Sequence, residues 1–178
     1  IKFSFLTMKG YFKGQSCLEL GCSGGIMTEL LVKSHTHLDV VDAVPSYIEK
    51  TKNRIGNKNN VNYYASFFEQ FQPARKYDDI IMSLVLEHVK NPVLILKKYR
   101  KYLKRDGRIH ILVPNAHSLH RLLGQSMGII KKVTDFSQRD RMLGHRRVYT
   151  VVSLRRDVYK AGLKVITEQG VFLKPLSN

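Results

Sequence analysis

CLELGCSGGIMTELL, residues 17–31, carries the strongest structural signal in the chain. It opens with a short apolar run that carries one acid, Glu19, and continues into a glycine-rich segment between Gly21 and Gly25. From Ile26 onward the apolar residues have the spacing of one helix face. A strand, a glycine turn and a helix in this order predict the first unit of an open α/β sheet. In such sheets ligands bind beyond the carboxyl ends of the strands.

The glycine positions exclude two common nucleotide-binding motifs. A dinucleotide fingerprint would need glycines at positions 21, 23 and 26, but Ser23 and Ile26 occupy two of them. A phosphate-binding P-loop would need a Gly-Lys-Ser/Thr ending, which the turn lacks. The remaining glycines still allow a backbone that a ligand can approach closely.

Length and composition predict one globular domain, residues 1–178. The apolar fraction is 43%, and no apolar run approaches the roughly 18 residues of a membrane helix. No signal peptide is visible at the amino terminus. The two cysteines, Cys17 and Cys22, are read as reduced thiols, so we expect a cytoplasmic protein.

The chain is strongly basic, with 30 Lys and Arg residues against 14 Asp and Glu residues and a net charge of +16. Such an excess favours anionic partners, which include nucleic acid, acidic membranes and phosphorylated small molecules. The basic residues are spread over several segments, so a lysine-rich solvated surface is the alternative interpretation.

Hydrophobic periodicity predicts alternating strands and helices along the rest of the chain. Gly56 and Pro114 are expected to end a helix and a strand respectively. Asn91 and Thr150 are expected to cap helices. The predicted strands are residues 38–43, 61–65, 77–85, 108–115, 163–167 and 171–173, and the predicted helices begin at residues 26, 45, 92, 118 and 151.

Asp42 stands at the predicted carboxyl end of the second strand, 17 positions beyond Gly25. In nucleotide-binding α/β sheets an acid at this place accepts hydrogen bonds from ribose hydroxyls. A charged acceptor makes such bonds strong and directional. The alternative is a solvated turn acid.

Two motifs in order resemble those of class I S-adenosylmethionine-dependent methyltransferases. Glu19, Gly21 and Gly25 fall on the first motif, Asp/Glu-x-Gly-x-Gly-x-Gly, although Ser23 replaces its middle glycine. Residues 78–92 resemble the fourth motif in its "vLEHv…nP" form. The chain is similar to the type 11/type 23 small-molecule methyltransferases over about residues 17–173.

This resemblance implies a Rossmann-like, doubly wound α/β fold with helices on both faces of the sheet. The sheet would be mostly parallel and seven-stranded, with an antiparallel last strand pair. The implied cofactor is S-adenosyl-L-methionine, and the product is S-adenosyl-L-homocysteine. Ser66 stands where related enzymes place an adenine-binding acid. The cofactor-binding residues predicted in this way are Glu19, Gly21, Cys22, Ser23, Gly25, Asp42, Ala43, Ser66, Phe67, Ser83 and Leu84.

Residues 116–149 are predicted to form a lid or substrate insertion, and residues 1–14 are a candidate short cap. A base is needed only when the acceptor must lose a proton, and histidine suits that role near neutral pH. The candidate bases are His117, His120 and His88, and the candidate acceptor-binding residues are His145, Arg146 and Tyr149. His88 could instead pack at a helix start, and His145 could fasten the lid. No residue pair shows zinc-site spacing, so no metal is predicted.

The sequence therefore predicts transfer of a methyl group from S-adenosylmethionine to an oxygen or nitrogen atom of a small, anionic molecule. RNA methylation by way of the basic surface is an alternative. It lacks support from the fourth motif, which reads Ser-Leu-Val-Leu at residues 83–86 instead of an Asn/Asp-Pro-Pro-aromatic tetrad. A non-catalytic paralogue that binds the cofactor is the third interpretation.

Overall fold

The computed structural model describes residues 1–171. The chain forms two compact units. The first comprises residues 1–83 and 98–112, and the second comprises residues 84–97 and the chain after residue 112. None of the helices in the described residues combines the length and the apolar character that a bilayer span requires.

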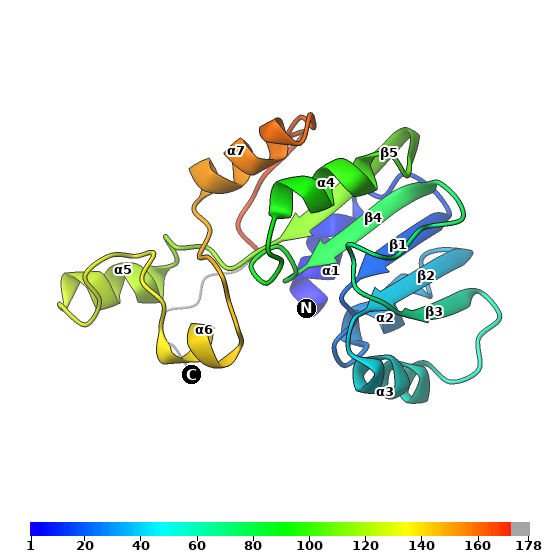
Figure 1. Cartoon of the computed structure of the whole chain (residues 1–178), viewed down its shortest axis with the longest axis horizontal. Helices are drawn as coiled ribbons and strands as arrows, with labels where there is room; N and C mark the ends of the chain where they lie inside the picture. The colour runs from blue at the N-terminus through cyan, green and yellow to red at the C-terminus, as the bar shows by residue number, and fades with distance from the viewer. Residues whose placement is uncertain (172–178) are drawn as a thin grey trace. The chain divides into compact units, whose positions relative to one another are not determined.

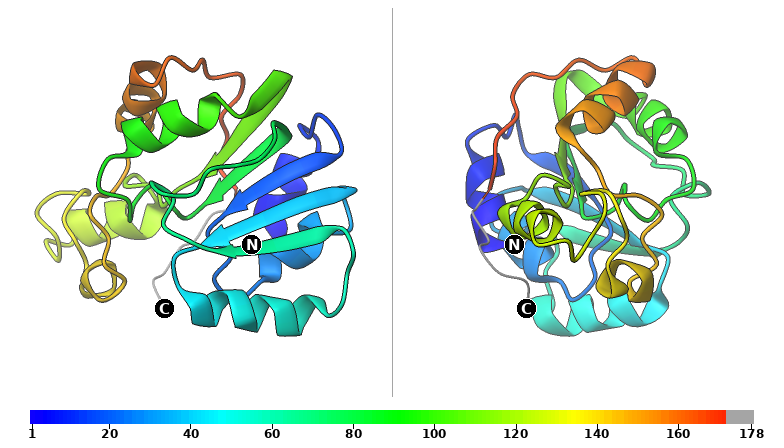
Figure 2. Two further views of the ribbon diagram at one scale, coloured as in Figure 1. Left: turned by 45° about the vertical axis from the view of Figure 1, so that its right-hand side comes forward. Right: turned by 90° about the vertical axis from the view of Figure 1, so that its left-hand side faces the viewer.

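The first unit is built on a sheet of five parallel strands (Figures 1 and 2). Their order in space is β3-β2-β1-β4-β5, so the chain winds outward from β1 in both directions. A doubly wound sheet of this kind reverses direction between β1 and β4, and its ligands bind at that switch. The strands are β1 (Ser16–Leu20), β2 (His37–Asp42), β3 (Val61–Ala65), β4 (Tyr77–Ser83) and β5 (Leu103–Leu112).

The prediction of seven strands with an antiparallel last pair is wrong for the described residues. Residues 163–167 form no strand and instead follow the last helix without regular structure. Gly170 and Val171 are also irregular, and the remaining predicted strand residues, 172–173, lie outside the described residues. A segment with β-propensity forms a strand only when it pairs with a neighbouring strand. In this sheet β5 is an edge strand whose one neighbour is β4, so residues 163–167 do not pair with it.

Three helices share one core with one face of the sheet. They are α1 (Lys2–Lys9), α2 (Ile26–Leu31) and α3 (Pro45–Ile55). Side chains of alternate strand positions, such as Val40 and Ile81, contact this core, as the period of two in a strand requires. The other face carries fully buried residues as well, such as Leu20 and Met82. Both faces are therefore covered, as expected of a parallel sheet.

The first helix, α1, was not predicted because its segment has no clear apolar period. Phe5 and Met8 nevertheless belong to the core, and the helix packs against α2. Whether residues 1–14 also cap a ligand stays a prediction.

The bounds of β5 differ from those predicted. The sequence predicts a strand at residues 108–115, but the strand begins at Leu103 and ends at Leu112. The register shifts between Tyr77 and Asp79, so residues 105–107 form an irregularity inside the strand. Gly107 lies there because a Cβ atom would come within 2.8 Å of the Tyr77 carbonyl oxygen.

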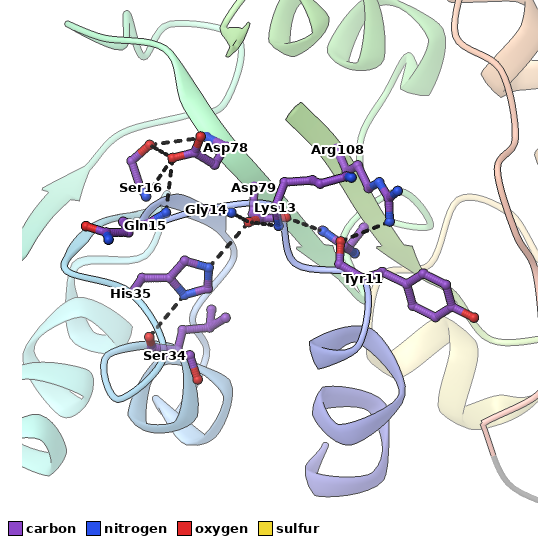
Figure 3. Close-up of polar contacts among 12 residues, drawn as sticks. Tyr11, Lys13, Gly14, Gln15, Ser16, Ser34, His35, Asp78, Asp79 and Arg108 are labelled. Atoms are coloured by element: carbon purple, nitrogen blue, oxygen red, sulfur yellow. Dashed lines mark hydrogen bonds and ion pairs between the residues drawn. The ribbon is translucent and has the colours of Figure 1, made fainter. Parts of the chain in front are cut away.

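Buried polar contacts fasten the amino-terminal half of β4 to the segment before β1 (Figure 3). Asp79 is fully buried, and its carboxylate accepts hydrogen bonds from Lys13 N at 2.9 Å and from His110 Nε2 at 2.7 Å. His35 lies 3.6 Å from the same carboxylate. Burial by itself would raise the pKa of Asp79, but these donors lower it well below its usual range.

Asp78 makes the neighbouring connection. It accepts hydrogen bonds from the Ser16 hydroxyl at 2.6 Å and from Lys104 Nζ at 2.8 Å. Burial opposes ionisation of Asp78, yet the bonds from Lys104 and Ser16 hold its pKa at about 2. The two acids thus fix the start of β1, whose other end carries the glycine turn.

The second unit contains three helices among its described residues, besides the first part of α4 (Pro92–Arg100). They are α5 (Leu119–Ser126), α6 (Gln138–Met142) and α7 (Val151–Lys160). The buried guanidinium of Arg121 organises the segment between α5 and α6, since it donates to the carbonyl oxygens of Val133 and Asp135 and to the Asp140 carboxylate. That residues 116–149 form a lid or substrate insertion stays a prediction.

Candidate functional site

The glycine turn between β1 and α2 has a backbone that few residue types adopt. Gly21, Ser23 and Gly25 have φ values of 81°, 50° and 77°, all in the left-handed region. Glycine reaches this region without cost, whereas serine does so rarely. The turn lies at the switch between β1 and β4, where the sheet topology predicts a ligand.

Gly25 is required by packing as well as by its backbone angle. A Cβ atom at this position would lie 3.1 Å from Thr51 Cα and 3.0 Å from its methyl group. Any side chain at residue 25 would therefore push α2 and α3 apart. Gly24, by contrast, has ordinary contact distances to its neighbours. Sequence analysis did not indicate this role of Thr51.

Asp42 lies directly against the glycine turn. Its Oδ2 atom accepts hydrogen bonds from Cys22 N at 2.9 Å and from Ser23 N at 3.3 Å, and its Oδ1 atom accepts one from Val44 N at 2.9 Å. The carboxylate is 7% exposed. The two segments that sequence analysis assigned to one site are thus neighbours, and Asp42 also shapes the turn.

Glu19 is fully buried at the end of β1. Thr28 donates a 2.6 Å hydrogen bond to its Oε2 atom, while Oε1 has no partner among the described residues. Burial raises the pKa of Glu19 to about 8, against the effect of the Thr28 bond and with a contribution from Asp42. A buried carboxyl oxygen without a partner is costly, so it indicates either strain or a place for a ligand.

The remaining predicted cofactor residues of the first unit differ in their contacts. Cys22 is a buried free thiol, and burial raises its pKa to about 12. The Ser66 hydroxyl bonds to the neighbouring Phe67 carbonyl, and the Phe67 ring is exposed.

Ser83 follows Met82, which pairs with Leu20 of β1. The buried hydroxyl of Ser83 has no partner in residues 1–171. Ala43 follows Asp42 and is partly buried.

Leu84 belongs to the second unit. Its φ of 59° makes it, with Ser23, one of two non-glycine residues with positive φ in the described chain. Both were predicted to bind the cofactor. Strained backbone of this kind clusters at functional sites.

In the second unit the structure brings His88 and His145 together. Their ring centroids are 4.7 Å apart, and the buried Glu87 lies beside them. His145 Nδ1 bonds to Asp140 Oδ1 over 2.9 Å. Asp140 is a residue that sequence reasoning missed, although the Ser137-x-x-Asp140 capping box was a readable signal.

The segment that contains Arg146 and Arg147 holds the loop after β4. Arg146 N donates to the Glu87 carbonyl oxygen at 2.8 Å. The Arg147 guanidinium donates to the carbonyl oxygens of Val89 and Lys90 at 2.7 and 3.0 Å, and to that of Leu86. Both interpretations of this segment, acceptor binding and fastening of the lid, stay predictions.

The remaining candidate bases, His117 and His120, and the acceptor-binding candidate Tyr149 also belong to the second unit. His117 is exposed and follows β5, and His120 lies on α5. Tyr149 is 2% exposed, and its hydroxyl bonds to Asp157 over 3.2 Å. The O–H group of Tyr149 is thus donated to Asp157, and contact of Tyr149 with an acceptor stays a prediction.

The sequence profile of a methyltransferase domain family matches residues 4–168 of this chain. The chain belongs to this methyltransferase family. The resemblance to class I S-adenosylmethionine-dependent methyltransferases that its motifs indicated is thus confirmed.

Two curated relatives illustrate the range of similarity. Malonyl-[acyl-carrier protein] O-methyltransferase 2 of Ilyobacter polytropus is 30% identical over 94 residues, which cover 52% of this chain and 36% of that protein. Ubiquinone biosynthesis O-methyltransferase of Coxiella burnetii is 25% identical over 186 residues, which cover this whole chain and 76% of the relative. The chain thus spans about a third of the first relative and three quarters of the second.

Solved structures show the same fold at low identity. The N-methyltransferase NodS from Bradyrhizobium japonicum, in complex with S-adenosyl-L-homocysteine, is 21% identical with a TM-score of 0.57, over 71% of this chain and 65% of that one. An S-adenosylmethionine-dependent methyltransferase from Leishmania major is 16% identical with a TM-score of 0.71, over 93% of this chain and 61% of that one.

Proposed function

We propose that this chain transfers a methyl group from S-adenosylmethionine to an oxygen or nitrogen atom of a small molecule. The observation that carries the proposal is the bond between the glycine turn and Asp42, because it places an exposed backbone turn and a carboxylate at the switch point of the sheet. Relatives in the same family are named as O- and N-methyltransferases.

The residues of the first unit fit a nucleoside ligand. The left-handed turn at Gly21, Ser23 and Gly25 keeps side chains away from the backbone. The Asp42 carboxylate has about four lone-pair positions and accepts three backbone hydrogen bonds, two on Oδ2 and one on Oδ1, so Oδ1 can still accept a hydrogen bond from a ribose hydroxyl. The unpartnered oxygens of Glu19 and Ser83 are further acceptors at the same ends of β1 and β4.

S-adenosylmethionine supplies a methyl group on a positively charged sulfur, which becomes neutral during transfer. The protein's task is therefore mainly to hold the acceptor in line and to exclude water. Buried carboxyl groups suit the binding of a cation, and Glu19 is such a group. No strong acid or base is required unless the acceptor has a proton to lose.

Histidine is the proposed base when the acceptor is a hydroxyl group. His117 and His120 follow β5 and remain the candidates for this role. Arg146 is exposed and could pair with an anionic acceptor. The net charge of +16 favours such an acceptor.

The test is transfer of radiolabel from methyl-labelled S-adenosylmethionine into a pool of small anionic metabolites and, separately, into total RNA. We expect the wild type to give a labelled small-molecule product. The Asp42→Asn variant should give much less of this product. Label that enters only RNA would contradict the acceptor class. Tight cofactor binding with no transfer to any pool would indicate the non-catalytic interpretation instead.

A further inference from the structure

The cluster of Glu87, His88 and His145 has the composition of a metal site. Each residue offers one ligand atom, and the three atoms lie within 4.8 Å of one another. All three residues belong to the second unit. The sequence did not reveal the cluster because the two histidines are 57 positions apart.

Glu87 is the observation that points to a missing ligand. The residue is 1% exposed, and neither of its carboxylate oxygens has a hydrogen-bond partner in the described part of the chain. Leaving a carboxyl group buried without partners is expensive, so native structures pair such groups or coordinate them to a metal. The Arg147 guanidinium donates to the backbone carbonyls of Leu86, Val89 and Lys90 and not to this carboxylate.

His145 has the second contact that metal-binding histidines usually show. Its Nδ1 atom bonds to Asp140 Oδ1 over 2.9 Å, which orients the ring and leaves Nε2 toward the cluster as the available ligand atom. Asp140 is itself held by Arg121 and Ser137, with distances of 3.2 Å to Arg121 Nη2 and 2.7 Å to the Ser137 hydroxyl. The ring therefore has a fixed support.

His88 supplies the third ligand from the loop after β4. Its ring centroid lies 4.7 Å from that of His145. Two neutral imidazoles and a carboxylate form the donor set of open, three-ligand zinc sites.

We infer that Glu87, His88 and His145 bind one divalent transition-metal ion such as Zn²⁺, with Asp140 as the outer support of His145. The ligand atoms of tetrahedral zinc lie roughly 3.3 Å apart when each is about 2 Å from the ion, so modest side-chain rotation closes the site. Three protein ligands leave one position open for water or for an oxygen atom of a small molecule. The sequence spacing had predicted no metal.

The bound ion would join the loop after β4 to the segment ahead of Tyr149. Arg146 and Arg147 already connect these two segments through backbone carbonyls. The ion would also occupy His88, which then could not act as a base. The inference does not depend on the proposed methyl transfer.

The test is titration of the full chain with Zn²⁺ in competition with a chromophoric chelator near pH 7.5. We expect one ion per chain. The variants Glu87→Gln and His145→Gln should bind Zn²⁺ at least about 100-fold more weakly, because loss of a residue that only supports a ligand already lowers metal affinity by about 10–100-fold. Asp140→Asn should fall in that smaller range. Glu49→Gln and His117→Gln, which change an exposed carboxylate and an exposed histidine, should bind like the wild type.

Co²⁺ gives an independent readout of the same site. The cobalt-loaded wild type should show visible d–d absorption bands that Glu87→Gln loses, while circular dichroism confirms that the variant is folded. Should Glu87→Gln not fold, His145→Gln serves in its place, again with circular dichroism to confirm the fold. Absence of stoichiometric uptake by the wild type, or equal affinity in the folded variants, would overturn the inference.

Discussion

The backbone N–H of Cys22 donates a 2.9 Å hydrogen bond to the carboxylate of Asp42, and this bond joins the glycine turn after β1 to the end of β2. One acid thus has two tasks. It holds the turn in shape, and it presents a charged acceptor beside that turn. Cofactor binding and the local structure of the turn are therefore linked through Asp42.

Replacing Asp42 with Asn should weaken S-adenosylhomocysteine binding by about 1.5–3 kcal/mol, since hydrogen bonds to a charged acceptor are lost. Isothermal titration calorimetry measures this as roughly a 10- to 150-fold rise in Kd. Asp39→Asn is the matched control on the same strand, because Asp39 bonds to Asn62 and Tyr77 away from the turn. Equal losses of affinity in both variants would remove the specific role of Asp42.

Gly25→Ala should destabilise the chain more than a positive φ alone explains. The backbone strain costs about 1–2 kcal/mol, and the contact with Thr51 adds about 1–3 kcal/mol of overpacking. Gly128→Ala is the control, because Gly128 has a φ of 72° and open space around it. Urea unfolding compares the two free energies of unfolding. Identical losses would show that Thr51 moves aside without cost.

Glu19→Gln should change how cofactor affinity depends on pH. With a pKa of about 8, Glu19 is protonated in the free protein at neutral pH, and a bound sulfonium favours the charged form. Wild-type affinity for S-adenosylmethionine should therefore rise from pH 6 to about pH 8, by at most about tenfold per unit, and then level off.

The measured quantity is the ratio of wild-type to Glu19→Gln affinity at each pH, because titration of the ligand cancels in this ratio. A ratio that stays constant between pH 6 and pH 9 would show that Glu19 does not respond to the cation. S-adenosylhomocysteine, which lacks the sulfonium charge, should give a weaker dependence.

Asp79→Asn should cost about 3–5 kcal/mol of stability near pH 7, because it leaves buried donors facing a neutral side chain. The folded-state pKa of Asp79 is lowered, so its contribution is complete above the pKa of an unfolded Asp, about 3.9. The contribution disappears as the pH falls toward the folded-state value.

Chemical denaturation between pH 7 and pH 2 tests this sign. The difference between the wild type and Asp79→Asn should shrink as the solution becomes more acidic. Asp106→Asn, at an exposed position of β5, should cost less than about 0.5 kcal/mol throughout. A difference that grows toward low pH would contradict the assignment of the lowered pKa.

Local patterns were sufficient for the elements that carry strong signals. The helix α3 has its predicted ends, with Pro45 at its start and Gly56 directly after it. The strand β3 also has its predicted ends. Asn91 caps α4 through a 3.0 Å bond to Leu94 N, as expected. Elements whose limits depend on tertiary contacts were missed, such as α1, which is held by Phe5 and Met8 in the core.

The candidate site was predictable where a motif has a fixed spacing. The glycine turn and Asp42 lie together because the parallel sheet aligns the ends of β1 and β2. Thr28 and Thr51 were not predicted, since only the packing of α2 and α3 brings them to the turn. The same holds for Glu87 and His145, which an irregular segment of the second unit brings together.

A crystal structure of the chain with S-adenosylhomocysteine would show whether the glycine turn and Asp42 together bind the cofactor. We predict electron density for the ligand against residues 21–25, with its ribose hydroxyls within hydrogen-bonding distance of the Asp42 carboxylate. Ligand density elsewhere on the chain, or a ribose that makes no contact with Asp42, would contradict the account.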